Sequence, residues 1–168
     1  MKWGITGTPG TGKTTATRIL ERDIIHLSEI LEQEKFQQEY DEERNTHVVD
    51  IEAVQAWVDD QPDTIIIESH LAHLLPVDRV IVLRCHPGEL RDRLKDRSHP
   101  RGQGIDENVE AERLDVILSE AVSRHSEDHV FEIDTTERSP EAVAELLAQV
   151  LNGTRRPAPG TVSFLGES

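Results

Sequence analysis

The sequence has a single cysteine, Cys85, and no long run of apolar residues. One cysteine excludes an intramolecular disulfide framework and is typical of a reducing compartment, and nothing beside Cys85 in the sequence would activate its thiol. Without a run of about 18 apolar residues, no membrane-spanning helix is expected. A strand is predicted directly at the N-terminus, so we expect no signal peptide. The sequence therefore predicts a cytoplasmic protein without membrane contact.

Lysine is also scarce. Only four of the 18 basic residues are lysines, whereas Asp and Glu number 33 and give a formal net charge of −15. Two interpretations stay open: an ordinary acidic protein, or a protein adapted to a high-salt cytoplasm, where salt screens the self-repulsion. The scarcity of lysine favours the halophile. Because an acidic surface repels nucleic acid at low salt, any contact with RNA should be local or made through a partner.

The residues present from Gly7 to Thr15, GTPGTGKTT, match the pattern G-x-x-x-x-G-K-[ST] of a phosphate-binding loop. Backbone N–H groups converge on phosphate oxygens in such a loop, and Gly10 and Gly12 leave their approach open. Lys13 is placed to meet the β- and γ-phosphates, and the hydroxyl of Thr14 is placed to ligate Mg²⁺.

The context supports this interpretation of the loop. An apolar strand is predicted before it, over residues 2–6, and a helix with one apolar face is predicted after it, over residues 15–22. Strand, glycine loop and helix is the order that a phosphate-binding loop requires, and a chance glycine-rich turn would not need it. The positive end of the helix dipole would lie at the same site.

Strands and helices alternate along the rest of the chain, which predicts an α/β fold of the P-loop NTPase class with a five-stranded parallel sheet flanked by helices. The expected strands cover residues 2–6, 24–27, 64–67, 79–84 and 129–134. Further helices are expected over residues 28–36, 51–58, 87–96, 107–125 and 140–152, and the fourth of these should turn Val109, Leu114, Ile117, Leu118 and Ala121 inward. We expect one domain over residues 1–152 and a flexible Pro- and Gly-rich tail over residues 153–168.

Two stretches interrupt this alternation. The first, at about residues 26–49, is acid-rich and is predicted to form an insertion that binds the phosphate acceptor. The second, at about residues 96–106, is polar and is predicted to form a short lid that excludes water from the γ-phosphate. Arg97 and Arg101 are the natural charges to meet the transferring phosphoryl group, although each could equally be a solvated surface arginine.

Glu68 closes an Ile-Ile-Ile strand, at the point where a second Mg²⁺-directed acid lies in this kind of fold, and it would pair with Thr14 through water. His70 follows two residues later and can point the same way. The alternative is that Glu68 only terminates the strand and that His70 packs under the next loop. We take Lys13, Arg97, His70 and Glu68 as candidate catalytic residues, and Thr14 and Glu68 as candidate metal ligands.

Several stretches together carry a family resemblance. They are the phosphate-binding loop, Tyr40-Asp41-Glu42-Glu43, Glu68-Ser69-His70, Val82-Leu83-Arg84 and Glu107-Asn108-Val109-Glu110-Ala111-Glu112. Over residues 1 to about 150 the sequence resembles the adenylate kinase isoenzyme 6 family in its archaeal form. These are small nucleoside monophosphate kinases that also act as ATPases in late maturation of the small ribosomal subunit.

The resemblance implies the ligands and their contacts. ATP and Mg²⁺ would be bound, AMP would be the acceptor, and a small-subunit ribosomal protein would be a partner. The implied ATP contacts are Gly10, Gly12, Lys13, Thr14 and Thr15, with Arg97 in the lid. The sequence departs from the family where Glu68 replaces the usual Asp before x-His, and where Ser98-His99 follows Arg97 in place of Gly and an aromatic residue.

Two functions therefore stay open. One is a metabolic kinase that moves a phosphoryl group from ATP to AMP or a related monophosphate. The other is an ATPase assembly factor, in which binding to a basic ribosomal protein is the main role and hydrolysis resets the complex. A regulatory GTPase is disfavoured because the sequence has no Asn-Lys-x-Asp motif for reading guanine.

Overall fold

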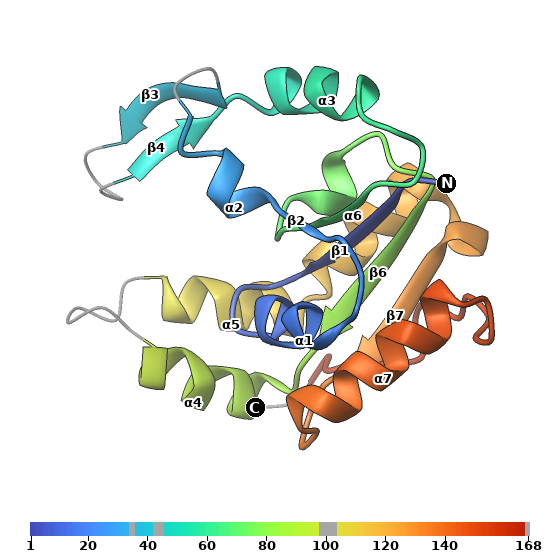
Figure 1. The fold of residues 1–168 in the computed structure, drawn as a ribbon. Coiled ribbons are helices and arrows are strands. Elements are labelled where there is room, and N and C mark those ends of the chain that lie inside the picture. The colour runs from blue at the N-terminus through green and yellow to red at the C-terminus, as the bar shows by residue number, and fades with distance from the viewer. Residues whose placement is uncertain (34–35, 42–45, 98–103, 167–168) are drawn as a thin grey trace.

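The computed structural model describes residues 1–33, 36–41, 46–97 and 104–166. A five-stranded parallel sheet in the order β2–β5–β1–β6–β7 forms its centre (Figure 1). The strands are β1 (Trp3–Gly7), β2 (Ile25–His26), β5 (Ile66–Glu68), β6 (Arg79–Arg84) and β7 (Val130–Asp134). The predicted five-stranded parallel sheet is confirmed.

Helices cover both faces of this sheet. Helices α1 (Lys13–Ile19) and α7 (Pro140–Leu151) pack on one face, and α3 (Ile51–Asp59) and α6 (Val116–His125) pack on the other. Successive strand residues point to opposite faces, so Ile65 and Ile67 join the core beside α3 and α6 whereas Ile66 joins the core beside α1 and α7. Burial on both faces explains why these strands are continuous apolar runs.

Two helix starts follow directly from the sequence. Asp50 caps α3, because its Oδ1 accepts a hydrogen bond from the backbone N–H of Ala53 at 3.2 Å. Ser139 caps α7 in the same way through Ala142, also at 3.2 Å, and Pro140 occupies the first helical position. Both caps agree with the predicted boundaries.

The predicted single helix over residues 107–125 is wrong. The chain instead forms α5 (Ile105–Arg113) and α6, separated by Leu114 and Asp115. Asp115 adopts a left-handed conformation with φ of 55°, and its carboxylate accepts a hydrogen bond from the buried Arg84 on β6. That tertiary contact breaks the helix, and Leu114, predicted to point inward, is 52% exposed.

The first of the two predicted insertions, at about residues 26–49, contains more regular structure than the sequence indicated. Helix α2 (Leu27–Ile30) is shorter than the predicted helix over residues 28–36, and it is followed by an antiparallel hairpin of β3 (Gln37–Asp41) and β4 (Thr46–Val49). The hairpin projects on the side of the molecule that also carries one end of α4 (Pro87–Arg97) and of α5 (Figure 1). The centre of the predicted lid, residues 98–103 with Arg101, lies outside the described residues.

The C-terminal segment is packed on the domain. The N–H of Val162 donates to Oε1 of Glu132 on β7 at 2.9 Å, and Phe164 is only 6% exposed. This differs from the flexible tail expected from the Pro- and Gly-rich composition, because the buried carboxylate of Glu132 takes hydrogen bonds from the tail. Two short 3-10 helices, η2 (Ala72–Leu74) and η3 (Glu127–His129), complete the described elements. None of the described helices is long and apolar enough to cross a membrane.

Candidate active site

The phosphate-binding loop joins the end of β1 at Gly7 to the start of α1 at Lys13. A Cβ on Gly7 would lie 2.6 Å from the carbonyl oxygen of Leu83, so only glycine permits this approach to β6. Gly12 has φ of 94°, and the nearest neighbour of a Cβ there would be Nη1 of Arg93 at 4.0 Å. The loop therefore keeps open space in front of its backbone.

Lys13 lies in this loop with its ammonium group turned inward. Its Nζ donates to the carbonyl oxygens of Gly7 at 2.8 Å and of Thr8 at 3.2 Å, and the residue is 7% exposed. Burial lowers the pKa of Lys13 from 10.5 to about 8, although the carboxylates of Glu68 and Glu112 oppose this shift. A buried ammonium that donates its hydrogen bonds to neutral carbonyls is suited to bind an anion.

Glu68, at the end of β5, contacts both α1 and the end of β2 through its side chain. It is the last residue of β5 and 4% exposed, and its Oε1 accepts a hydrogen bond from Oγ1 of Thr14 at 3.0 Å. The other carboxylate oxygen, Oε2, lies 3.1 Å from Nδ1 of His26 at the end of β2. The sequence indicated that Glu68 and Thr14 lie together, but with a water between them, whereas the two side chains here share a direct hydrogen bond.

His70 lines the same cavity as Lys13 and Glu68, while its side chain still reaches solvent. Desolvation of the imidazole inside the cavity lowers the pKa of His70, and the nearby charge of Lys13 lowers it further. The imidazole is therefore biased towards its neutral form, in which one ring nitrogen can accept a hydrogen bond.

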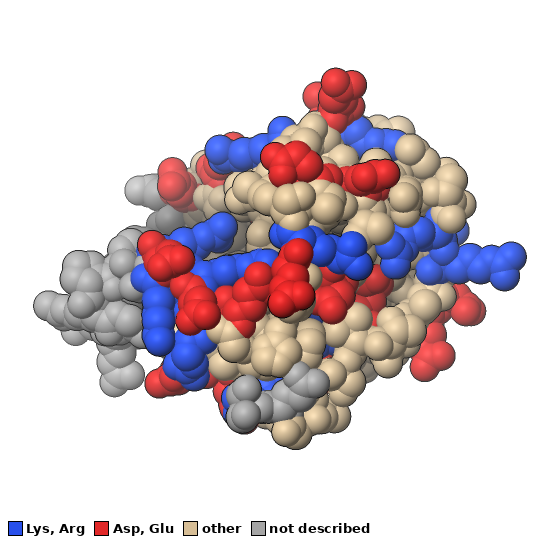
Figure 2. Space-filling view, turned by 90° about the horizontal axis from the view of Figure 1, so that it is seen from below, with Lys and Arg blue, Asp and Glu red and all other residues tan. Residues whose placement is uncertain are grey.

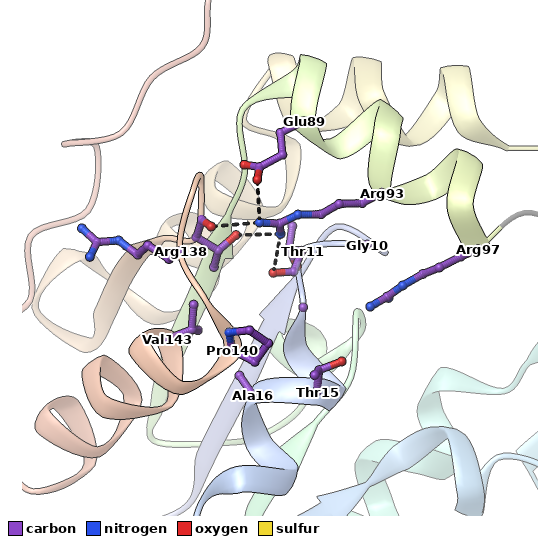
Figure 3. A pocket seen from close by; sticks show the side chains of 12 residues that line it. Gly10, Thr11, Thr15, Ala16, Glu89, Arg93, Arg97, Arg138, Pro140 and Val143 are labelled. Carbon is purple, nitrogen blue, oxygen red and sulfur yellow. Dashed lines mark hydrogen bonds and ion pairs between the residues drawn. The ribbon is translucent and has the colours of Figure 1, made fainter.

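The site contains a first cavity of about 300 Å³ beside α1 and α7 (Figure 3). It is lined by Gly10, Thr11, Gly12, Thr15, Ala16, Glu89, Arg93, Arg97, Thr135, Arg138, Pro140 and Val143. Figure 3 shows Arg93 and Arg97 extending from α4 on one side of this cavity, with Arg138 on the other side. Apolar contacts from Ala16, Pro140 and Val143 beside cationic groups suit a flat, polar-edged ring such as a nucleobase.

A second cavity, of about 230 Å³, lies beside the loop and α2. It is lined by Pro9, Gly10, Gly12, Lys13, Thr14, Ser28, Leu31, Glu68, Ser69, His70 and Arg97. The two cavities share Gly10, Gly12 and Arg97. The structure thus brings together the predicted site residues that it describes: Gly10, Gly12, Lys13, Thr14, Thr15, Glu68, His70 and Arg97.

Sequence reasoning missed Arg93, which fixes the wall of the first cavity. Its Nη2 donates to the carbonyl oxygen of Thr135 at 2.9 Å, its Nη1 donates to that of Thr11 at 3.3 Å, and its guanidinium pairs with Glu89 at 3.3 Å. Arg93 could have been found, because it precedes Arg97 by four residues and so shares its face of α4. Arg138 had no such signal, and His26 was not among the candidate site residues.

A buried ion pair lies behind the loop. Nε of Arg84 donates to Oε1 of Glu112 at 3.0 Å, and both side chains are almost fully buried. The same carboxylate accepts the backbone N–H of Cys85 at 3.0 Å, and Oγ1 of Thr8 lies 3.5 Å from it. Burial raises the pKa of Glu112, and Arg84 opposes that shift.

Cys85, buried at the end of β6, packs as expected, and burial raises the pKa of its thiol to about 12.

The surface around α4 and α7 carries both signs of charge. Figure 2 shows Lys and Arg side chains interleaved with Asp and Glu on this face. Several of the arginines on α4 and α5 are paired: Arg91 with Asp106, Arg93 with Glu89, and Arg113 with Glu110. This face does not offer the continuous basic surface that broad nucleic-acid binding requires.

Within the described residues, no group of three or more His, Cys, Asp or Glu side chains could hold a metal ion by itself. A phosphate-loop site does not need one, because its Mg²⁺ is held by one hydroxyl, one acid and the nucleotide phosphates. The hydroxyl of Thr14 and the carboxylate of Glu68, 3.0 Å apart, fit that donor set.

A parallel sheet with a glycine loop at the carboxyl end of β1, a buried loop lysine and an adjoining acid defines a P-loop nucleotide-binding protein. The model of a family described as "AAA domain" matches residues 4–115. A protein of Natronomonas pharaonis is 52% identical over 166 residues, which cover 98% of each chain. A protein of Halobacterium salinarum is 46% identical over 167 residues, again 98% of each chain. A third, of Methanothermobacter thermautotrophicus, is 43% identical over 166 residues and 96% of each chain.

All three relatives carry the description "Putative adenylate kinase". The chain therefore belongs to this archaeal adenylate kinase family and contains its AAA domain.

Two solved structures share the fold. Shikimate kinase from Acinetobacter baumannii, in complex with shikimate, aligns with a TM-score of 0.61 at 12% identity, over 92% of this chain and 94% of that one. Deoxyadenosine kinase from M. mycoides aligns with a TM-score of 0.55 at 20% identity, over 92% and 100%. These likenesses confirm the P-loop kinase fold.

Proposed function

We propose that this protein is an ATP-dependent nucleoside monophosphate kinase that converts ATP and AMP into two ADP. One observation carries the proposal: two cavities meet at Gly10, Gly12 and Arg97, one on each side of the phosphate-binding loop. A protein that only bound ATP would need the first cavity alone. Two cavities with a shared wall can hold a donor and an acceptor whose phosphates meet between them.

The first cavity would hold the adenosine of ATP. Ala16, Pro140 and Val143 provide apolar contacts, and Arg138 provides a cation beside the ring. Thr15 borders the same space. The phosphates would follow the loop past Gly12, where no side chain obstructs them, to the ammonium group of Lys13.

Lys13 and Arg97 would stabilise charge during transfer. An oxygen of the AMP phosphate bonds to the γ-phosphorus while the bond from that phosphorus to the bridging oxygen of ADP breaks, and negative charge spreads over the transferring group. Lys13 can exchange its carbonyl partners for phosphate oxygens, and Arg97 borders both cavities. Because Lys13 is already held in place by the loop carbonyls, little reorganisation of its ammonium group is needed at the moment of reaction.

Thr14 and Glu68 would hold Mg²⁺, Thr14 directly and Glu68 through water. When bound, the ion neutralises charge on the β- and γ-phosphates and orients them. Thr14 and Glu68 already share a hydrogen bond, so a small separation of the two oxygens would give the donor pair. Ser28, Leu31 and His70 line the remaining part of the second cavity, where the acceptor would lie.

The test is an assay of ADP formation from ATP with AMP, CMP, UMP or GMP, and from ATP alone. We expect AMP to give two ADP for each ATP consumed, at a rate well above that with ATP alone. A Lys13→Ala preparation purified in the same way measures contaminating kinase. The proposal fails if no monophosphate raises ADP formation above the rate with ATP alone.

A second candidate is an ATPase that assists late maturation of the small ribosomal subunit, with kinase activity secondary. The net charge of −15 supports it, because such a surface is complementary to a basic small-subunit ribosomal protein. Contact with rRNA would then be local, in keeping with the interleaved charges in Figure 2. The protein would act in the cytoplasm.

One variant separates the two candidates. His70 and Glu68 should matter most when water is the acceptor, since hydrolysis needs a positioned water that AMP would replace. His70→Ala should therefore depress ATP hydrolysis more than transfer to AMP, with both rates measured on one preparation, with and without the basic protein. Equal loss of both rates would assign His70 to the fold or the metal. A basic partner that neither binds nor changes hydrolysis would eliminate the assembly role.

A further inference from the structure

His26 is the last residue of β2, and its side chain contacts the site, although it was not among the residues predicted for the site. Its Nδ1 lies 3.1 Å from Oε2 of Glu68, and the two side chains are 14% and 5% exposed. An ionised carboxylate only accepts hydrogen bonds, so Nδ1 of His26 must carry a hydrogen and donate it. The contact is largely shielded from water.

The two oxygens of Glu68 therefore have different partners. Thr14, on α1, donates to Oε1, and His26, on β2, donates to Oε2. A glutamate has one more rotatable bond than an aspartate, so its carboxylate can adopt more orientations. Two hydrogen bonds from two different elements restrict the carboxylate to a single orientation.

His26 also lies next to the acceptor side of the site. Helix α2 begins at the following residue, and Ser28 and Leu31 line the second cavity together with Glu68. Register pairs His26 with Glu68 across β2 and β5, so the strand pairing itself places the two side chains together. Among the strand residues whose side chains the structure describes, His26 is the one histidine.

We propose that His26 is a positioning residue that orients Glu68 toward Mg²⁺. The inference rests on the proposed function, in which Glu68 faces the metal. His26 acts through Glu68, so its loss should weaken metal-assisted nucleotide binding while leaving metal-free binding unchanged. Loss of such a supporting hydrogen bond costs about tenfold or more in metal affinity or activity.

The experiment measures the dissociation constant of ADP by calorimetry, with Mg²⁺ and with EDTA, for the wild type and four variants. His26→Ala should lose about tenfold of the Mg²⁺-dependent gain in affinity, with an unchanged constant in EDTA. His26→Asn keeps an N–H close to the position of Nδ1 and should restore most of the gain. His26→Gln places its N–H near the position of Nε2 and should not. The exposed His129 supplies the matched control, and His129→Ala should behave as wild type.

A second readout needs neither nucleotide nor catalysis. In the nucleotide-free protein, ¹⁵N NMR of the imidazoles should show a protected Nδ1–H for His26, and Glu68→Ala should abolish that protection. An unprotected Nδ1, or no response to Glu68→Ala, would overturn the contact itself. A protected Nδ1 combined with an unchanged Mg²⁺-dependent gain in His26→Ala would overturn the positioning role.

These outcomes are separate from failure of the proposed function. A protein that lacks AMP phosphorylation but shows the expected calorimetric pattern retains His26 as a positioning residue of a Mg²⁺-nucleotide site. Suppose instead that the protein phosphorylates AMP and that Mg²⁺ raises the ADP affinity of His26→Ala and of wild type equally. The proposed kinase function would then stand, and the positioning role of His26 would be wrong.

Discussion

The ring of Phe164 lies over the guanidinium group of Arg84, with 5.3 Å between Cζ and the ring centre. The same guanidinium donates to the carbonyl oxygen of Val162 at 3.3 Å and to Oε2 of Glu132 at 2.8 Å. The C-terminal segment thus covers a buried cation that also pairs with Asp115 and with Glu112, and Glu112 lies behind the phosphate-binding loop. The tail is part of the folded domain.

Phe164→Ala should therefore destabilise the protein. Truncating a buried phenylalanine costs about 3–5 kcal/mol, and here the change would also admit water to the charges around Arg84. We expect a lower midpoint in urea unfolding, with an unchanged far-UV circular dichroism spectrum at zero urea. The neighbouring Leu165 is 62% exposed, so Leu165→Ala is the matched control and should leave the midpoint unchanged. Equal midpoints for both variants would show that the tail does not contribute to stability.

Lys13→Ala should remove both phosphoryl transfer to AMP and ATP hydrolysis, and leave the fold intact. Loss of one preorganised donor at a charged transition state lowers kcat about a hundredfold or more. Initial rates of both reactions, together with circular dichroism, check this. Lys95→Ala, a change at an exposed lysine of α4, should retain activity. Normal turnover by a folded Lys13→Ala protein would remove the loop lysine from the mechanism.

Nucleotide affinity should depend on pH through Lys13. Its pKa in the nucleotide-free protein is about 8 because of burial, and only the ammonium form attracts phosphate. The affinity for ADP in EDTA should therefore fall as pH rises above about 8. Because the charge of Arg97 lowers the pKa of Lys13, Arg97→Ala should move this decline to higher pH. A constant affinity up to about pH 10 would contradict the assignment.

The same pKa predicts a trend in stability. A folded-state pKa below the ordinary 10.5 contributes stability that is present above 10.5 and lost as pH falls through about 8. The unfolding free energy of the nucleotide-free wild type should therefore rise from pH 8 to 10.5 relative to Lys13→Met. Parallel curves for the two proteins over that range would show that Lys13 is not buried as a charge.

Arg97→Ala should lower kcat more than it raises KM, because the charge that Arg97 meets develops mainly in the transition state. Steady-state kinetics with varied ATP at saturating AMP separates the two constants. Arg156→Ala, a change at an exposed arginine of the C-terminal segment, is the control for loss of one positive charge. An unchanged kcat with a raised KM would show that Arg97 only binds ATP in the ground state.

Salt should stabilise the fold. The net charge of −15 repels itself at low ionic strength, and screening weakens that repulsion. The relatives from Natronomonas pharaonis and Halobacterium salinarum, which are halophiles, share about half of the sequence. We expect the melting temperature to rise as KCl increases from about 0.1 M to about 2 M, where the Debye length falls below about 3 Å. A flat or falling melting temperature would favour the ordinary acidic protein.

The sequence by itself determined the phosphate-binding loop and the sheet. All groups of the loop lie within nine consecutive residues, so Gly12, Lys13 and Thr14 have their roles set by local spacing. The strands were predictable because burial on both faces requires continuous apolar runs, and the caps at Asp50 and Ser139 act over three residues. Glu68 was predictable from its place at the end of such a run.

Only the tertiary structure decided the contacts between distant segments. His26 meets Glu68 across 42 residues, and Arg84 reaches 31 residues along the chain to Asp115, where it breaks a helix that the apolar periodicity had predicted as continuous. The tail binds Glu132 for the same kind of reason, since a buried carboxylate needs donors wherever the chain can supply them. Local sequence fixes which groups a segment offers, whereas the choice among partners depends on which segments the packed sheet brings within hydrogen-bonding distance.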